Sequence, residues 1–309
     1  MNHLSELVGQ DIARRMLEQY IRLPAPPLMI LYGPDGTGKW SAAEAFVQQK
    51  LCEVGTACGT CASCRKFLAG DHADFIRFPA DRVAIGDPDR PEEFTIRWLI
   101  KTRIIYAPFD GPVRFVLFPA AHLMQHEAET ALLKTLEEPP EHTRFIFLTP
   151  SLQALKPTVI SRGVAIPFRN LPLDAMRKFE LKIPEDRLEL LGGSLHPVPF
   201  FYSELYELME SKIADGLAHP LSLLDLENWI LGAERNQFKN VTGDESFSFG
   251  EILDFFSLLL LHHCRKHERG GRLTRIIFDF KQELGRERPG MLPYLTGRMF
   301  FRLNQVLFK

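Results

Sequence analysis

Residues 33–39, GPDGTGK, have the glycine and lysine spacing of a phosphate-binding loop. In such a loop the glycines let successive backbone N–H groups converge on phosphate oxygens, and the following helix adds a favourable partial charge. We therefore expect Gly33, Gly36 and Gly38 to form a phosphate cradle and Lys39 to reach the outer phosphates. The alternative is an ordinary strand–helix turn that shares this spacing.

The residues that would hold magnesium beside this loop are missing. Trp40 stands where a serine or threonine hydroxyl would coordinate the ion, and an indole has no acceptor for a cation. The apolar run 113–118 continues into Pro119 and Ala120, where an aspartate that orders magnesium and a glutamate that activates water are expected. We therefore expect no magnesium site and no hydrolysis, and an empty or anion-filled loop in preference to bound ATP.

Four of the five cysteines crowd into residues 52–64 in the pattern C-x5-C-x2-C-x2-C. Four thiolates complete a tetrahedral zinc shell and leave no open position, so we expect a structural zinc held by Cys52, Cys58, Cys61 and Cys64. Free thiols and an iron–sulfur cluster are the alternatives. The nearby His72 is expected to be an ordinary loop or surface residue, and the isolated Cys264 a packed thiol.

The elements that must position these residues follow from the hydrophobic pattern. The first half of the chain alternates short apolar runs with segments of helical periodicity, which predicts an α/β domain with a parallel sheet. The expected strands are 28–32, 74–78, 83–85, 113–118, 144–149 and 164–168, and the expected helices are 4–22, 38–51, 92–105 and 126–139. The glycine-rich loop then lies between a strand and a helix, as a phosphate loop requires.

From about residue 171 onward the sequence has almost only helical periodicity. A long helix is expected over 243–271, and two more over 272–287 and 291–308. We predict three domains: an α/β domain at 1–170 with the cysteine insert at 52–64, a small helical domain at 171–215 and a helical bundle at 216–309.

The composition is that of a globular protein: 309 residues, 45% hydrophobic and 25% charged, with a net charge of -2. An autonomous duplex binder usually carries a basic excess, so the charge argues against a free-standing, zinc-dependent nucleic-acid binder. The most apolar run, 255–261, is too short to cross a bilayer, and the N-terminus lacks the profile of a signal peptide. We expect a cytoplasmic protein.

Four motifs in this order resemble the clamp-loader subunits of bacterial DNA polymerase III: GPDGTGK, the cysteine quartet, ALLKTLEEPPEHTRFIFLT and LKPTVISR. The resemblance covers roughly residues 6–170, and it is to delta-prime and its gamma/tau relatives. It implies an AAA+ α/β P-loop domain with a parallel sheet, then a small helical lid domain and a C-terminal all-helical collar domain. Gamma and tau keep the ATPase residues that this chain lacks, so the resemblance implies a catalytically degenerate, non-hydrolysing subunit that acts as the stator.

The same resemblance places Arg162, in the sequence VISRG, at the family's S-R-C motif. It implies an arginine finger that acts in trans on ATP held by a neighbouring subunit; the alternative is a surface arginine that caps a helix or pairs with a nearby acid. Gly163 replaces the motif's cysteine, which we expect to loosen the local backbone.

The implied partners are the gamma/tau and delta subunits, with the sliding clamp and primer–template DNA reached through the complex and no membrane. The polymerase activity would belong to the whole assembly. The competing reading is a gamma/tau-like P-loop ATPase that binds and hydrolyses ATP itself.

Overall fold

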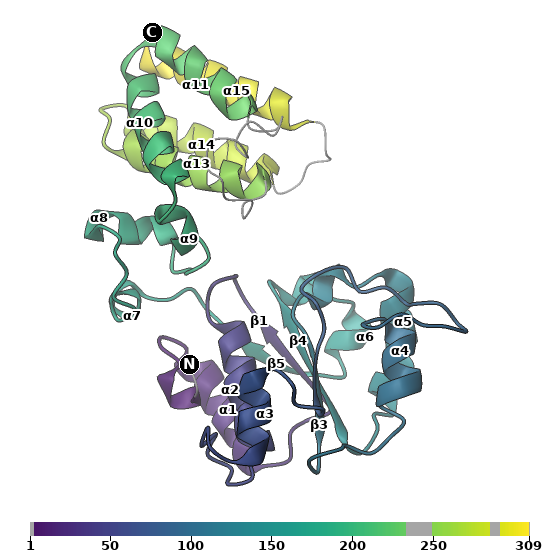
Figure 1. The fold of residues 1–309 in the computed structure, drawn as a ribbon. Coiled ribbons are helices and arrows are strands. Elements are labelled where there is room, and N and C mark those ends of the chain that lie inside the picture. Colours follow the sequence, from purple (N-terminus) through teal and green to yellow (C-terminus); the bar gives the residue numbers. More distant parts are fainter. Residues whose placement is uncertain (1–2, 233–248, 285–290, 309) are drawn as a thin grey trace. The chain divides into compact units, whose positions relative to one another are not determined.

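The computed structural model describes residues 3–232, 249–284 and 291–308. The chain divides into two compact units, which are treated separately here: Met1–Lys182 with Gly192–His196, and Ile183–Leu191 with Pro197–Lys309. The first unit holds a sheet with helices on both faces, and the second holds helices (Figure 1). The finer division into a lid at 171–215 and a collar at 216–309 stays a prediction.

The sheet of the first unit has five parallel strands in the order β2-β3-β4-β1-β5. The strands are β1 (Leu28–Tyr32), β2 (Phe75–Arg77), β3 (Arg114–Phe118), β4 (Thr143–Thr149) and β5 (Val164–Pro167). The inner strand β1 pairs with β4, Leu28 opposite Phe145, and with β5, Met29 opposite Val164. The expected parallel sheet is therefore confirmed, and the carboxyl ends of β1, β3 and β4 meet at one edge.

Two hydrophobic cores cover the two faces of the sheet, because successive strand residues point to opposite sides. On β3, Phe115 and Leu117 belong to one core and Val116 and Phe118 to the other. Helices α1, α2 and α3 lie on one face and α4, α5 and α6 on the other (Figure 1). Their bounds are α1 (Asp11–Arg22), α2 (Lys39–Leu51), α3 (Ala62–Ala69), α4 (Ile96–Trp98), α5 (His126–Glu137) and α6 (Pro157–Ile160), with short turns η1 (Leu4–Glu6), η3 (Ala121–Leu123) and η4 (Leu152–Ala154) and a last helix α7 (Leu173–Arg177).

Three sequence predictions for this unit need correction. Residues 83–85 are not a strand, because the carbonyls of Ala84 and Ile85 accept from the N–H groups of Ile96 and Arg97 instead of from a neighbouring strand. The helix expected over 92–105 begins only at Ile96, where the Thr95 hydroxyl caps it, and continues as a π-helical turn, η2 (Leu99–Arg103). The helix expected over 4–22 is wrong at its start as well, because residues 4–6 form only a short turn, Gly9 has a φ of 70° and α1 begins at Asp11.

The described part of the second unit is helical, as expected. It comprises α8 (Glu185–Leu188), η5 (Glu189–Leu191), α9 (Val198–Phe201), α10 (Glu204–Ala218), α11 (Pro220–Gly232), α13 (Phe249–Arg265), α14 (Gly270–Leu284) and α15 (Leu292–Leu307). The single long helix expected over 243–271 is wrong for its described part, since α13 ends at Arg265 and a turn precedes α14; residues 243–248 lie outside the described residues. The unit packs around buried apolar side chains, among them Phe256 and Phe300, whose rings lie 6.0 Å apart.

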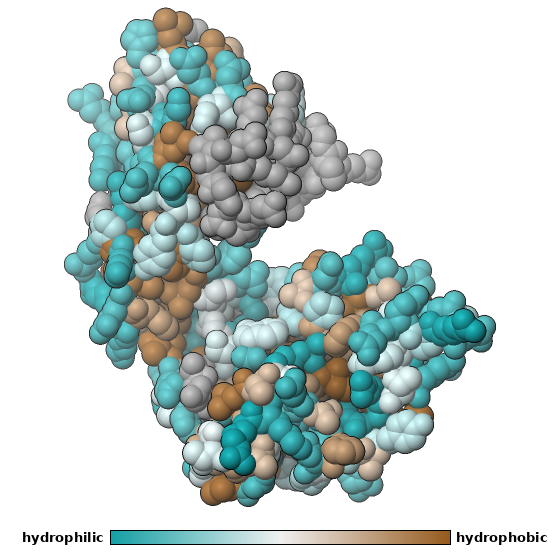
Figure 2. Space-filling view, viewed as in Figure 1, coloured by the Kyte–Doolittle hydropathy of each residue, from teal (hydrophilic) through white to brown (hydrophobic). Residues whose placement is uncertain are grey.

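On the visible face of the first unit, hydrophilic and hydrophobic residues are interspersed (Figure 2). No helix in the described ranges is long and apolar enough to span a membrane.

Candidate functional site

The glycine-rich loop connects β1 to α2, which is the predicted context. Gly33, Gly36 and Gly38 have φ values of 141°, 68° and 94°, a region that side-chain-bearing residues rarely adopt. Gly33 has a second constraint, because a Cβ there would lie 2.0 Å from the carbonyl oxygen of Phe168. Gly38 forms the N-cap of α2, so the loop and the helix start have the form of a phosphate cradle.

Lys39 does not extend into open space but is bound by its own loop. Its Nζ lies 2.5 Å from the Gly33 oxygen, 2.8 Å from the Pro34 oxygen and 3.1 Å from Asp35 Oδ1. An ammonium group has three donors, so these contacts use its full capacity. Only 7% of the Lys39 side chain is exposed, and the Asp35 carboxylate supplies the negative charge that a phosphate would bring.

A second segment of the same unit covers the loop. Ser194 Oγ donates to the Asp35 carbonyl at 2.6 Å, and the Leu195 N–H donates to the Gly36 carbonyl at 2.9 Å. A Cβ on Gly36 would lie only 2.1 Å from the His196 nitrogen, so the backbone at 194–196 fills the space above this glycine. The sequence pattern gave no signal for this cover, because the two segments are far apart along the chain.

The three positions that would supply magnesium ligands or the acidic residue that activates water are occupied by Trp40, Pro119 and Ala120. Trp40 is 39% exposed, and Pro119 and Ala120 follow directly after β3. Beyond them, His122 faces the loop; burial lowers its pKa, Asp35 opposes this shift and Lys39 adds to it. Thr149 is buried at the end of β4, and its hydroxyl donates to the Ser151 carbonyl at 2.9 Å, so the side chain is bound within the fold.

Arg162 follows α6 and is tied to its own chain. Its Nη2 lies 2.6 Å from Glu137 Oε1 at the end of α5, and its Nη1 donates to the Thr158 carbonyl. The side chain remains 29% exposed, and that of Glu137 is 50% exposed. The surface ion pair named as the alternative is therefore present in the single chain, and the finger role stays a prediction.

The glycine after Arg162 is explained by packing. A Cβ on Gly163 would lie 2.8 Å from Ile30 Cδ1 and 3.0 Å from Leu28 Cδ2, both on β1. A cysteine at this position would therefore displace side chains of the sheet core. The backbone of Gly163 therefore packs closely against β1. We expected this glycine to loosen the local backbone, but its main effect in the structure is to permit this close packing.

The four cysteines of the insert converge as predicted. Their sulfurs all lie within 4.8 Å of one another, with Cys52 Sγ 3.8 Å from Cys58 Sγ and 4.0 Å from Cys61 Sγ. A tetrahedral zinc site with Zn–S bonds of about 2.3 Å requires sulfur separations of roughly 3.8 Å. The donor set and its spacing therefore fit a closed structural zinc site.

Backbone N–H groups point at these sulfurs. The Cys61 N–H donates to Cys58 Sγ at 3.4 Å, and the Cys64 N–H donates to Cys61 Sγ at 3.3 Å. Burial raises the pKa of Cys52, but N–H groups of Cys58, Val54 and Thr56 outweigh it and bring the pKa to about 6. The thiolate form that a metal requires is thus favoured at this ligand.

Cys64, by contrast, has a pKa that burial raises to about 12, so the site needs a cation to hold all four thiolates together. The fifth cysteine, Cys264, is buried in α13, where burial raises its pKa to about 12. This is the packed thiol expected from the sequence.

His72 was expected to be an ordinary loop or surface residue; it lies in the loop before β2, but it is not at the surface. It is only 5% exposed, and its Nδ1 accepts from the Asp74 N–H at 3.2 Å. That bond leaves Nε2 as the donor, to Ser63 Oγ at 3.0 Å, and the Ser63 hydroxyl donates to the Leu51 carbonyl at 2.6 Å. His72 therefore ties the end of α2 and the start of α3, which carry cysteines, to the segment before β2.

The sequence of this chain is similar to subunits of bacterial DNA polymerase III. The family model described as "DNA polymerase III, delta subunit" matches residues 12–172. The gamma/tau subunit of DNA polymerase III from Mycobacterium tuberculosis is 30% identical over 200 residues, which cover 63% of this chain and 33% of that protein. The delta' subunit from Pseudomonas aeruginosa is 35% identical over 138 residues, covering 44% of this chain and 40% of that protein.

The chain spans about a third of the length of the gamma/tau relatives that it matches. Among solved structures, a gamma subunit-related protein from Thermotoga maritima is 18% identical with a TM-score of 0.47. That alignment covers 94% of this chain and 99% of the other.

Proposed function

The chain belongs to the DNA polymerase III delta-subunit family, and from this premise we propose that it is a non-hydrolysing subunit of the clamp-loader complex in DNA replication. It acts as a stator and lends a charge to ATP bound by a neighbouring subunit. Its first unit has the P-loop and parallel sheet of an AAA+ module.

One observation carries the proposal: the phosphate loop keeps its backbone but has neither the groups for hydrolysis nor a free lysine. Trp40 replaces the hydroxyl, and Pro119 and Ala120 replace the two acids. Lys39 already has three partners in its own loop. A nucleotide would have to displace Asp35 and the cover at 194–196, and it would still have no coordinated magnesium to neutralise charge.

Arg162 is the residue that we propose acts on the neighbour. Its partner Glu137 is half exposed, and ion pairs of this kind contribute only about 0–1 kcal/mol to stability. A triphosphate brought close by another subunit carries more negative charge and would compete with that carboxylate. Arginine fingers in phosphoryl transfer supply roughly 10³–10⁵ in rate.

The proposed partners are the gamma/tau and delta subunits, with the sliding clamp and primer–template DNA reached through the complex. In this proposal zinc is bound structurally by Cys52, Cys58, Cys61 and Cys64, and the location is the cytoplasm. The helical segments 171–215 and 216–309 would serve as lid and collar.

The alternative is a gamma/tau-like subunit that hydrolyses ATP itself. It is favoured by the preserved glycine and lysine spacing and by the gamma/tau relatives. It requires a magnesium site built from residues other than Trp40, Pro119 and Ala120.

The finger role is tested by Arg162→Ala in a clamp loader reconstituted with gamma/tau and delta subunits. We expect assembly and zinc content to be unchanged, and hydrolysis at the adjoining site to fall by about 10³ or more. Arg15→Ala, an exposed arginine on α1, is the matched control, and Arg162→Lys tests whether charge alone suffices. Equal DNA-stimulated ATPase rates in wild type and Arg162→Ala would remove the finger role while leaving the stator role standing.

A further inference from the structure

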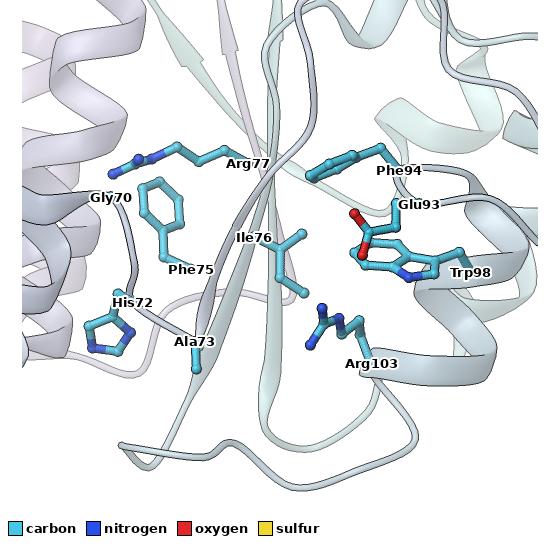
Figure 3. A pocket seen from close by; sticks show the side chains of 10 residues that line it. All are labelled: Gly70, His72, Ala73, Phe75, Ile76, Arg77, Glu93, Phe94, Trp98 and Arg103. Carbon is cyan, nitrogen blue, oxygen red and sulfur yellow. The ribbon is translucent and has the colours of Figure 1, made fainter.

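A groove lies along the free edge of the sheet, away from the phosphate loop, and its lining includes His72, which ties the cysteine insert to the segment before β2. Its cavity has a volume of about 250 Å³, and its floor is β2 (Figure 3). Phe75 and Arg77 lie on one side of the strand, and Ile76, Phe94, Trp98 and Arg103 on the other (Figure 3). Neither the phosphate loop nor the proposed finger uses any of these residues.

Strand β2 has one strand neighbour, β3, in the sheet order of the described residues. In a parallel sheet, every second residue of a strand directs its N–H and C=O groups to the same neighbouring strand. The Asp74 carbonyl accepts from Phe115, and the Phe78 N–H donates to Leu117, both on β3. Asp74 and Phe78 thus belong to the set that faces β3, and Arg77 belongs to the other set. The N–H and C=O groups of Arg77 therefore point away from β3, toward the groove, where they can pair with an added strand.

The wall on the α4 side is aromatic. The Phe94 and Trp98 ring centroids lie 5.4 Å apart, and Phe94 also contacts Phe78 at 5.7 Å. Phe94 has a φ of 59°, which costs a residue with a side chain of order 1 kcal/mol or more, and the residue is 39% exposed. The backbone thus holds an aromatic side chain at the groove, where it offers apolar contact.

Each side of the groove also presents an arginine over an aromatic ring. The Arg77 guanidinium carbon lies 4.6 Å from the Phe75 ring centroid, and that of Arg103 lies 5.0 Å from the Trp98 centroid. Arg77 has one acidic partner, Glu44, at 3.5 Å, while Arg103 has no carboxylate within 4 Å among the described residues. Glu93 is the one acid that lines the groove, so its charge is positive on balance.

We propose that this groove binds an extended acidic peptide of a partner protein, which pairs with β2 and extends the sheet by one strand. The exposed peptide groups select a polypeptide, because a backbone partner is what they can pair with in register. Side chains of an added strand alternate between the two faces of the sheet, so acidic residues on one face would reach Arg103 beside Trp98, while the apolar residues between them would lie on the face of Phe75 and Arg77. The proposal does not depend on the role of Arg162.

The probe is a pool of fluorescein-labelled peptides with aspartate or glutamate at alternating positions and apolar residues between them. We expect saturable binding by fluorescence anisotropy, and at least tenfold weaker binding in Arg103→Glu. Lys178→Glu, an equally large charge change on an exposed residue elsewhere in the unit, should bind like wild type. Amide exchange over residues 75–78 should slow when the peptide is added, because an added strand protects the edge.

Three outcomes would overturn the proposal. The first is no saturable binding of the acidic pool, or equal binding of a pool with lysine in place of the acids. The second is equal affinity in Arg103→Glu and Lys178→Glu. The third is displacement of the peptide by a short oligothymidylate that itself binds more tightly, which would make the groove a site for single-stranded nucleic acid.

Discussion

The side chain of Lys39 is bound by residues of its own phosphate loop. The Asp35 carboxylate and two backbone carbonyls occupy the ammonium group of Lys39, so the charge that would meet a phosphate is neutralised locally. A buried lysine needs such partners, because an unpaired charge out of water is costly. Gly36 completes the arrangement, since it lets the backbone at 194–196 approach the loop.

Gly36→Ala should therefore destabilise the first unit strongly. The new Cβ would meet the His196 nitrogen at 2.1 Å in addition to adopting a positive φ. We expect a loss of about 2 kcal/mol or more in the free energy of unfolding, measured by urea titration.

Gly192→Ala is the matched control, because Gly192 has a φ of 57° and nothing within 4 Å of its Cβ position. It should cost only the conformational part, about 1 kcal/mol. Equal losses in the two variants would show that segment 194–196 does not lie against the loop in solution.

Sequence spacing predicted the residues whose partners are close along the chain. The cysteines converge as expected, because short spacings within one insert restrict where the sulfurs can go. Asp35 as the partner of Lys39 and His72 as a buried tether were not predicted. The first depends on a side-chain rotamer, and the second on contact between segments that hydrophobic periodicity does not relate.

At the scale of elements, a buried ion pair joins β2 to β3 and to the loop before β3. Asp74 is fully buried and lies 3.3 Å from Arg114 Nη2. Its carboxylate also accepts from the N–H groups of Phe109 and Asp110, at 2.8 and 2.6 Å. One side chain therefore fixes the loop that leads into β3.

Asp74→Ala should unfold the first unit easily, because it leaves Arg114 buried without its acid. Removing one partner of a buried pair costs about 3–5 kcal/mol. Asp71→Ala, at an exposed acid three residues earlier, should change the midpoint of thermal unfolding little. A similar small shift in both variants would contradict the structural role of Asp74.

The cysteine insert is a second element whose stability we expect to depend on a metal. Cys64→Ser should lower the zinc content from one ion per chain to a small fraction, measured by mass spectrometry of the metal. Cys264→Ser removes a buried thiol outside the cluster and should keep the zinc. Full zinc retention in Cys64→Ser would exclude a four-cysteine site.

The strands were predictable because most of them are continuous apolar runs buried on both faces, as parallel strands require. Residues 83–85 have the same composition but bond to the start of α4, which no local pattern reveals. The end of α13 was placed too late because the charged residues 265–269 are compatible with a helix, and the turn was expected only at Gly270 and Gly271.

For the whole molecule, we interpret the chain as a structural partner that retains the architecture of a nucleotide-binding module without its chemistry. The sheet, the loop and the helix that follows are kept, whereas the hydroxyl and the acids beside them are replaced. In the proposed role, such a subunit would contribute by its position and by charges that it presents to others.

The most direct test of this account is the rate of magnesium-dependent ATP hydrolysis by the purified chain, compared with Lys39→Ala after both are shown to be folded and zinc-bound. We predict that the wild-type rate does not exceed that of the variant. Turnover by the wild-type chain that disappears in Lys39→Ala would contradict the account, because it would require a working magnesium site at this loop.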